Sequence, residues 1–171
     1  MVDTATHWMP AYIGVGSNLD DPALQVRRAI AALGDLPETR LVAASFSYSN
    51  PPMGPQDQPD YVNAAAGVIT RLEPSRMLGE MQKLEQSLGR VRTPDDRWGP
   101  RIIDLDLLVY GIRQLDEAGL TLPHPGISER NFVLFPLRDI APDLFVPGQG
   151  VVAALARGMS EVGLQRVDGG G

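Results

Sequence analysis

Cysteine is absent from this 171-residue sequence, and lysine, histidine and long apolar runs are scarce. Without cysteine the chain can form no disulfide, no thiolate zinc site and no cysteine nucleophile. No apolar run reaches the roughly 18 residues that a membrane-spanning helix needs. The N-terminus also lacks the basic and apolar regions of a secretory signal. We therefore expect a cytoplasmic protein with no membrane partner.

The basic residues are uneven in kind and in position. Lys83 is the only lysine among 15 basic residues, so the others are arginine. Four of these arginines lie between Gly89 and Arg101, although the whole chain carries a net charge of −6. The acidic balance argues against nucleic-acid binding. Clustered arginines, as planar bidentate donors, suit phosphate groups.

Two aspartates, Asp104 and Asp106, interrupt the apolar, branched run of residues 102–110. Such a run predicts a buried strand. A period of two places both carboxylates on one face, with their Cα atoms about 6–7 Å apart. Because carboxylates on an apolar face repel, a positive group must lie between them. Mg²⁺ fits this role, and an arginine salt bridge to each aspartate is the alternative.

Hydrophobic periodicity predicts two helices among four extended runs. The helices begin near Pro22 and Pro74 and end at Gly34 and Gly89, and the first is capped by Asp20 or Asp21. The resulting β-α-β-β-α-β order indicates an α+β, ferredoxin-like sandwich with a mostly antiparallel sheet, whose helices cover one face and leave the other for ligands. The extended runs are expected at residues 11–16, 41–49, 61–70 and 102–110.

The remaining residues are expected to form an irregular C-terminal extension. It contains a hairpin strand near residues 120–122 and short helices near Pro136 and Val151. One domain is expected over residues 1–171, with flexible tails at 1–10 and 167–171.

Several smaller motifs have more than one interpretation. Gly14-Val15-Gly16 lacks the context of a phosphate-binding loop, so we interpret it as a turn. Tyr61 and Asn63 share a strand face and suit a flat heterocycle, but a core tyrosine and a cross-strand amide fit equally well. Phe132 is either an opposite stacking wall or part of the core.

His124 lies between two prolines, which gives it a rigid backbone. It can donate to a phosphate oxygen or fold onto a carbonyl group, and Arg130, six residues later, favours phosphate. The loops at residues 50–60 and 89–100 are longer than their connections require, which is typical of functional loops.

Together these motifs closely resemble the 6-hydroxymethyl-7,8-dihydropterin pyrophosphokinases of folate biosynthesis. The most specific match is the aspartate strand with its leader Arg97-Trp98-Gly99-Pro100-Arg101, and the likeness covers roughly residues 11–145. Further matches in order and spacing lie at residues 12–19, 54–65, 89–92, 122–125 and 130–137.

The resemblance implies a Mg-dependent enzyme that transfers diphosphate from ATP to the pterin hydroxymethyl group and releases AMP. It implies two Mg²⁺ ions on Asp104 and Asp106. The positions that match ATP contacts or close the site are Gln82, Glu85, Arg90, Arg92, Arg101, His124 and Arg130, and Arg90, Arg92 and Arg101 count with the aspartates as catalytic. The positions that match pterin contacts are Pro52, Met53, Gly54, Tyr61, Asn63, Trp98 and Phe132.

The sequence departs from some relatives at Thr93–Asp96, Gly119 and Pro125, which puts ATP affinity and closure in question. We expect a monomer that acts on small molecules, and ordered closure of loops 50–60 and 89–101 once both substrates are bound. Two alternatives remain open. One is another metal-dependent nucleotidyl or phosphoryl transferase on the same fold, and the other is a degenerate paralogue that binds without turnover.

Overall fold

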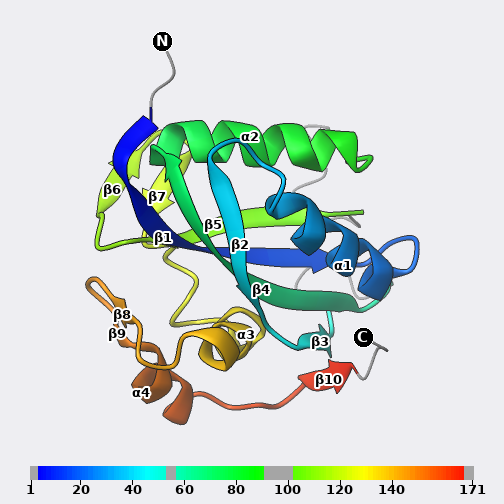
Figure 1. Ribbon diagram of the computed structural model, residues 1–171. Coiled ribbons are helices and arrows are strands. Elements are labelled where there is room, and N and C mark those ends of the chain that lie inside the picture. Colours follow the sequence, from blue (N-terminus) through cyan, green and yellow to red (C-terminus); the bar gives the residue numbers. More distant parts are fainter. Residues whose placement is uncertain (1–3, 53–56, 91–101, 168–171) are drawn as a thin grey trace.

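A computed structural model describes residues 4–52, 57–90 and 102–167. Its centre is a 6-stranded antiparallel sheet with the strand order β10-β3-β4-β1-β5, in which β2 also pairs with β4 (Figure 1). The first helix follows β1 and the second follows β4, which confirms the ferredoxin-like β-α-β-β-α-β order. The strands of this sheet are β1 (Thr4–Ser17), β2 (Thr39–Ala44), β3 (Ser47–Asn50), β4 (Tyr61–Leu72), β5 (Asp104–Tyr110) and β10 (Gln165–Val167).

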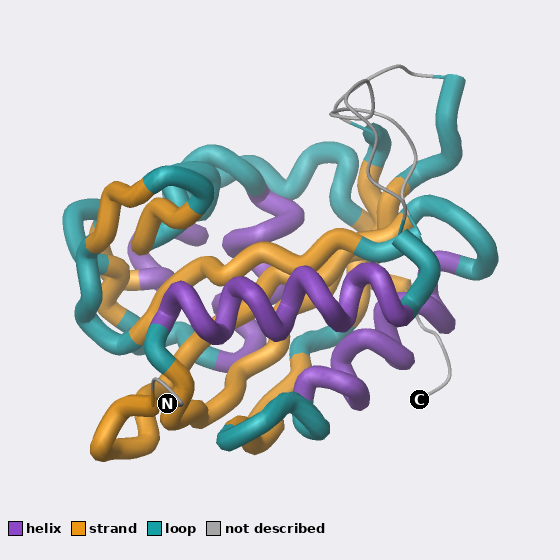
Figure 2. The backbone as a smooth tube through the Cα atoms, turned by 90° about the horizontal axis from the view of Figure 1, so that it is seen from above, coloured by secondary structure: helices purple, strands orange, loops and turns teal. Residues whose placement is uncertain are grey.

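Helices α1 (Pro22–Leu33) and α2 (Pro74–Ser87) cover one face of the sheet (Figures 1 and 2). Proline occupies the first turn of each helix, where the missing N–H would have had no helical partner. Asp21 takes the expected N-cap position of α1, but its side chain makes no capping hydrogen bond. Within the described ranges, no helix is long and apolar enough to cross a bilayer.

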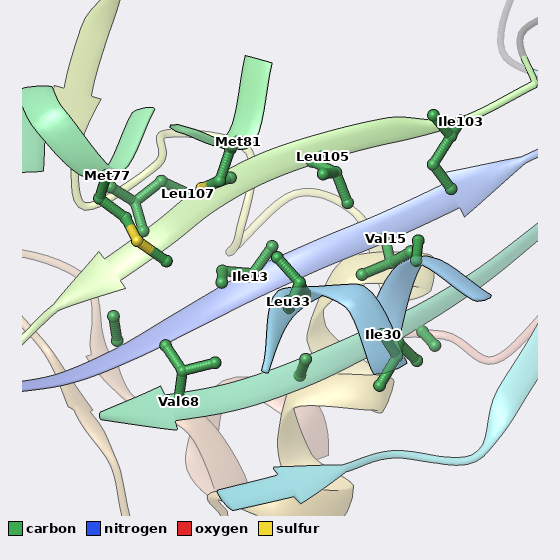
Figure 3. Packing of buried hydrophobic residues seen from close by; sticks show 14 of the residues in the cluster. Ile13, Val15, Ile30, Leu33, Val68, Met77, Met81, Ile103, Leu105 and Leu107 are labelled. Atoms are coloured by element: carbon green, nitrogen blue, oxygen red, sulfur yellow. The ribbon is translucent and has the colours of Figure 1, made fainter. Parts of the chain in front are cut away.

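Apolar side chains from both helices and from three strands of the sheet form the main core between these layers, together with Leu120 and Leu122 (Figure 3). Helix α2 contributes Met77 and Met81, both fully buried. The core residues labelled in the figure are Ile13, Val15, Ile30, Leu33, Val68, Met77, Met81, Ile103, Leu105 and Leu107.

The opposite face of the sheet is partly covered, which corrects the expectation that it is left for ligands. A second core forms there between the sheet and the C-terminal segment (Figure 1). A register shift between β1 and β5 turns Leu108 and Val109 toward this second core, a break in alternation that sequence cannot show. The covering elements are the hairpin β8 (Phe145–Val146) with β9 (Gly150–Val151) and the helices α3 (Asn131–Ile140) and α4 (Val152–Arg157). The hairpin β6 (Leu115–Glu117) with β7 (Leu120–Leu122) instead packs Leu115, Leu120 and Leu122 against the main core.

The extended run expected at residues 41–49 is divided into β2 and β3. Ser45 lies between them and continues the pairing with β4. Its N–H donates to the Ala65 carbonyl oxygen at 2.9 Å, and its Oγ accepts from the Ala65 N–H at 2.8 Å. The side-chain oxygen therefore takes the place of a backbone acceptor, and the strand is interrupted without leaving the sheet.

The expected tails are shorter than the sequence indicates. β1 begins at Thr4, so residues 4–10 belong to the sheet, and Val167 of β10 pairs with Ser47 of β3. Part of the reason lies at Trp8, where the Arg40 guanidinium stacks 4.8 Å from the ring centroid. This contact joins β1 to β2 and is not visible in the local sequence.

Candidate active site

A pocket of about 480 Å³ lies where the second face of the sheet meets α3. Strands β1, β4 and β5 each contribute side chains or backbone to it, α2 adds Gln82, and α3 adds Phe132. Asp104 and Asp106 of β5 line this pocket, and both are half-buried. Their partners on β1 are Gly16 and Gly14, so the two carboxylates share one strand face, as predicted.

Two glycines of β1 form the floor of the pocket. Sequence analysis expected a turn at these residues. Gly14 and Gly16 lie inside β1, between β4 and β5, so the turn interpretation is wrong. A Cβ atom on Gly16 would lie 2.6 Å from the Asn63 Oδ1 atom. The missing side chains therefore make room between the aspartates of β5 and the polar residues of β4. Glycine at alternate positions of a strand was the available signal.

Tyr61 and Asn63 form the β4 side of the pocket. Both are half-buried, and Phe132 of α3 lines the same pocket. The Asn63 Nδ2 atom donates a hydrogen bond to the Asn50 Oδ1 atom at 2.6 Å. The structure thus brings together the three residues that were expected to hold a flat ring. It adds Asn50, which sequence analysis did not single out.

Arg90 bridges two carboxylates beside the pocket. Its NH1 group lies 2.6 Å from Asp104 Oδ1 and 2.7 Å from Glu85 Oε2. Burial alone would lower the pKa of Arg90, but the two carboxylates hold it above its usual value. For Asp104, an arginine salt bridge is therefore present in the structure, alongside the predicted metal role.

Glu85 of α2 joins Arg90 to the backbone of β5. Its side chain is only 1 % exposed, and Oε2 also accepts the Leu105 N–H at 2.8 Å. Because β5 is an edge strand, this amide points away from β1 and toward α2. The predicted contact of Glu85 with ATP stays a prediction, and the structure places its carboxylate on Arg90 and on the backbone between the two aspartates.

His124 and Arg130 close the pocket from the C-terminal segment. The His124 Nδ1 atom accepts the Gly126 N–H at 2.9 Å, so a neutral ring carries its proton on Nε2. Burial lowers the pKa of His124, Arg130 lowers it further, and Asp104 opposes the shift. The ring is therefore a neutral donor through Nε2 near pH 7, and its contact with a phosphate oxygen stays a prediction.

Two carboxylates are too few to hold a metal ion with protein ligands alone, but they suit Mg²⁺ that is also bound by substrate phosphates. No group of three or more histidine, aspartate or glutamate side chains capable of holding a metal occurs in the part of the chain that the structure describes. Mg²⁺ is commonly bound by one or two carboxylates together with substrate phosphates. Asp104 and Asp106 supply such a pair.

Several of the predicted site residues cannot be placed in the structure. Met53, Gly54, Arg92, Trp98 and Arg101 lie outside the described residues, as does the departure at Thr93–Asp96. Pro52 is described and buried. Gly119 and Pro125 line a smaller adjoining pocket of about 300 Å³, which shares Asp106 and His124 with the first.

Comparison with known proteins shows the family of this chain. The family model described as 7,8-dihydro-6-hydroxymethylpterin-pyrophosphokinase (HPPK) matches residues 12–142. A 2-amino-4-hydroxy-6-hydroxymethyldihydropteridine pyrophosphokinase from Haemophilus influenzae is 45% identical, over 86% of this chain and 91% of its own. The Pseudomonas aeruginosa protein of the same name is 44% identical, over 92% of this chain and 96% of its own. The chain belongs to the HPPK family.

Solved structures show the same fold at low sequence identity. The wild-type Plasmodium falciparum HPPK-DHPS with pteroate aligns with a TM-score of 0.69 and 12% identity, covering 89% of this chain. This chain spans only 42% of that protein's chain. The likeness therefore supports the fold of the HPPK part alone.

Proposed function

We propose that this protein transfers the diphosphate group of ATP to the hydroxymethyl group of 6-hydroxymethyl-7,8-dihydropterin and releases AMP, a step of folate biosynthesis. One observation carries the proposal beyond family membership. A single pocket contains Tyr61, Asn63 and Phe132 at one side and Asp104, Asp106 and His124 at the other. A flat ring and a polyphosphate could therefore lie side by side.

The β4 side of the pocket suits the pterin. Tyr61 and Phe132 provide aromatic faces for a flat heterocycle, and Asn63 provides an amide that can meet its hydrogen-bonding edge. We assign pterin binding to these residues together with Pro52, Met53, Gly54 and Trp98. Gly14 and Gly16 leave the floor open for the ring.

The β5 side suits the triphosphate. Two Mg²⁺ ions held by Asp104 and Asp106 would offset the negative charge of the phosphate oxygens. His124 donates from Nε2, and Arg130 adds positive charge beside it. We assign the remaining ATP contacts to Gln82, Glu85, Arg90, Arg92 and Arg101.

The reaction forms one bond and breaks one. The hydroxymethyl oxygen attacks the β-phosphorus of ATP, and the bond from that phosphorus to the oxygen shared with the α-phosphate breaks. AMP leaves, and the hydroxyl proton is released to the solvent. The protein's contribution is to place the two substrates in line and to keep water away from the phosphate.

The identity of the released nucleotide tests the proposal. Purified protein with Mg²⁺, ATP and 6-hydroxymethyl-7,8-dihydropterin should form AMP, whereas another phosphoryl transferase would release ADP and a binding protein without turnover would release neither. Asp106→Asn should lower turnover by far more than tenfold, a change of more than 1.4 kcal/mol in the activation barrier. Asp143→Asn, at an exposed turn, is the matched control and should leave turnover unchanged.

Two results would refute the proposal. One is release of ADP or no nucleotide by the wild-type protein, and the other is turnover of the folded Asp106→Asn variant within tenfold of wild type. We also propose that the protein acts as a cytoplasmic monomer. Sedimentation at working concentration measures the oligomeric state.

A further inference from the structure

The amide of Asn63 lies between β3 and β1 within the pocket. On the β3 side, its Nδ2 atom donates to Asn50 Oδ1 at 2.6 Å. On the β1 side, its Oδ1 atom lies over Gly16, where a Cβ atom would approach to 2.6 Å. The nitrogen of the amide therefore faces β3, and the oxygen faces the bare backbone of the pocket floor.

Asn50 itself can take only one orientation without losing a bond. It is 6 % exposed and is the last residue of β3. Its Nδ2 atom donates to the Pro51 carbonyl oxygen at 3.1 Å, which leaves Oδ1 as the atom that meets Asn63. If the Asn63 amide turned over, two carbonyl oxygens would face each other at hydrogen-bond distance. If both amides turned over, the bond to Pro51 would be lost.

The fixed orientation has a consequence for ligand choice. A free asparagine side chain can present its oxygen or its nitrogen at a given point, and so it accepts two ring orientations or two kinds of ring edge. With Asn50 in place, Asn63 presents its acceptor on the β1 side and its remaining N–H on the β3 side. A ring edge with the reverse order of donor and acceptor would leave these groups unpaired, which is costly in a half-buried pocket.

We propose that Asn50 is a positioning residue that sets the hydrogen-bonding direction of Asn63 and thereby selects the ring edge that the pocket accepts. The inference rests on the proposed function, because it takes the pterin as the ring. Asn50 acts through Asn63, so its contribution depends on the Asn63 amide. This dependence separates it from a residue that only supports β3 or that contacts the ligand directly.

A double-mutant cycle tests the proposal. Pterin binding is measured by calorimetry on the full chain for the wild type, Asn50→Leu, Asn63→Ala and the double variant. Leucine keeps a similar size without an acceptor. Asn50→Leu should weaken pterin binding by about tenfold. In the Asn63→Ala background, the same substitution should have almost no further effect.

A second variant approaches Asn63 from its other side. Gly16→Ala places a methyl group against Asn63 Oδ1 and should weaken pterin binding too, with a smaller further loss in the Asn63→Ala background than in the wild type. This arm tests the orientation of Asn63 even if Asn50→Leu fails to fold. For each variant, circular dichroism checks the fold. Binding of a non-hydrolysable ATP analogue should stay within twofold of wild type.

The outcomes separate this inference from the proposed function. Equal losses from Asn50→Leu with and without the Asn63 amide would overturn the inference while leaving pterin binding by the wild type intact. No loss in the Asn50→Leu variant would overturn it as well. A wild-type protein that does not bind pterin would overturn the proposed function, and the inference with it.

Discussion

Replacing Glu85 with alanine should lower the free energy of unfolding by about 3 kcal/mol, because the substitution removes one partner of a buried ion pair. Glu85 is 1 % exposed, and the Arg90 side chain is 10 % exposed, so water cannot readily replace the lost carboxylate. The Leu105 N–H also loses its acceptor, at a cost of about 1–3 kcal/mol. Asp104 remains beside Arg90, which keeps the total at the low end of the range for buried pairs.

Glutamine at position 85 separates charge from hydrogen bonding. One oxygen of Glu85, Oε2, accepts from both Arg90 and Leu105, so the single oxygen of glutamine can take over both bonds. Glu85→Gln should therefore cost about 1–2 kcal/mol, less than alanine does, since it keeps an acceptor for Arg90 and for the Leu105 N–H. Glu38→Gln is the matched control. Its partner Arg71 is exposed, so the change should cost less than about 1 kcal/mol.

Urea unfolding followed by circular dichroism at constant pH measures these differences. Similar slopes with denaturant concentration in all variants would show that the unfolding transition has kept its character. The reasoning fails if Glu85→Ala costs no more than Glu38→Gln. It also fails if Glu85→Gln costs as much as Glu85→Ala, because the ordering depends on Oε2 serving two donors.

Two further predictions concern His124 and Asn18. Burial and Arg130 hold the pKa of His124 below its usual value in the folded protein, so the unfolded chain takes up a proton first and stability falls as the pH drops through about 6.5 and below. The melting temperature of His124→Gln should therefore fall less between pH 7.5 and 5.5 than that of wild type, and equal falls would contradict this account. Asn18 is 1 % exposed, and its amide donates to Gln58 Oε1 and to the Pro59 carbonyl oxygen, both at 3.0 Å. Asn18→Ala should cost about 1–3 kcal/mol in urea unfolding, and a cost below about 0.5 kcal/mol would show that these bonds contribute nothing net.

The same-face pairs of the site were predictable because strand alternation is a local property. Asp104 with Asp106 and Tyr61 with Asn63 each lie two residues apart, and the structure places each pair along one pocket wall. Helix positions followed in the same way from apolar spacing and from the prolines that open α1 and α2. Their catalytic and binding roles remain predictions that the experiments above address.

Alternation failed where the backbone departs from regular pairing. The shift between β1 and β5 sends both Leu108 and Val109 toward the second core, so one face of β5 could not be followed from its sequence alone. Ser45 divides an apparently continuous strand by accepting a backbone N–H with its hydroxyl. Both features depend on the neighbouring strand, which the local pattern does not specify.

The amino-acid sequence by itself determined the β-α-β-β-α-β order, the shared face of the two aspartates and the likeness to pterin pyrophosphokinases, because each depends on residues close together in the chain. Only the tertiary structure decided that Gly14 and Gly16 form a floor, that Arg90 joins Asp104 to Glu85, and that Asn50 orients Asn63. These contacts join different elements. Their geometry follows from strand register and helix packing, which no local pattern of residues encodes.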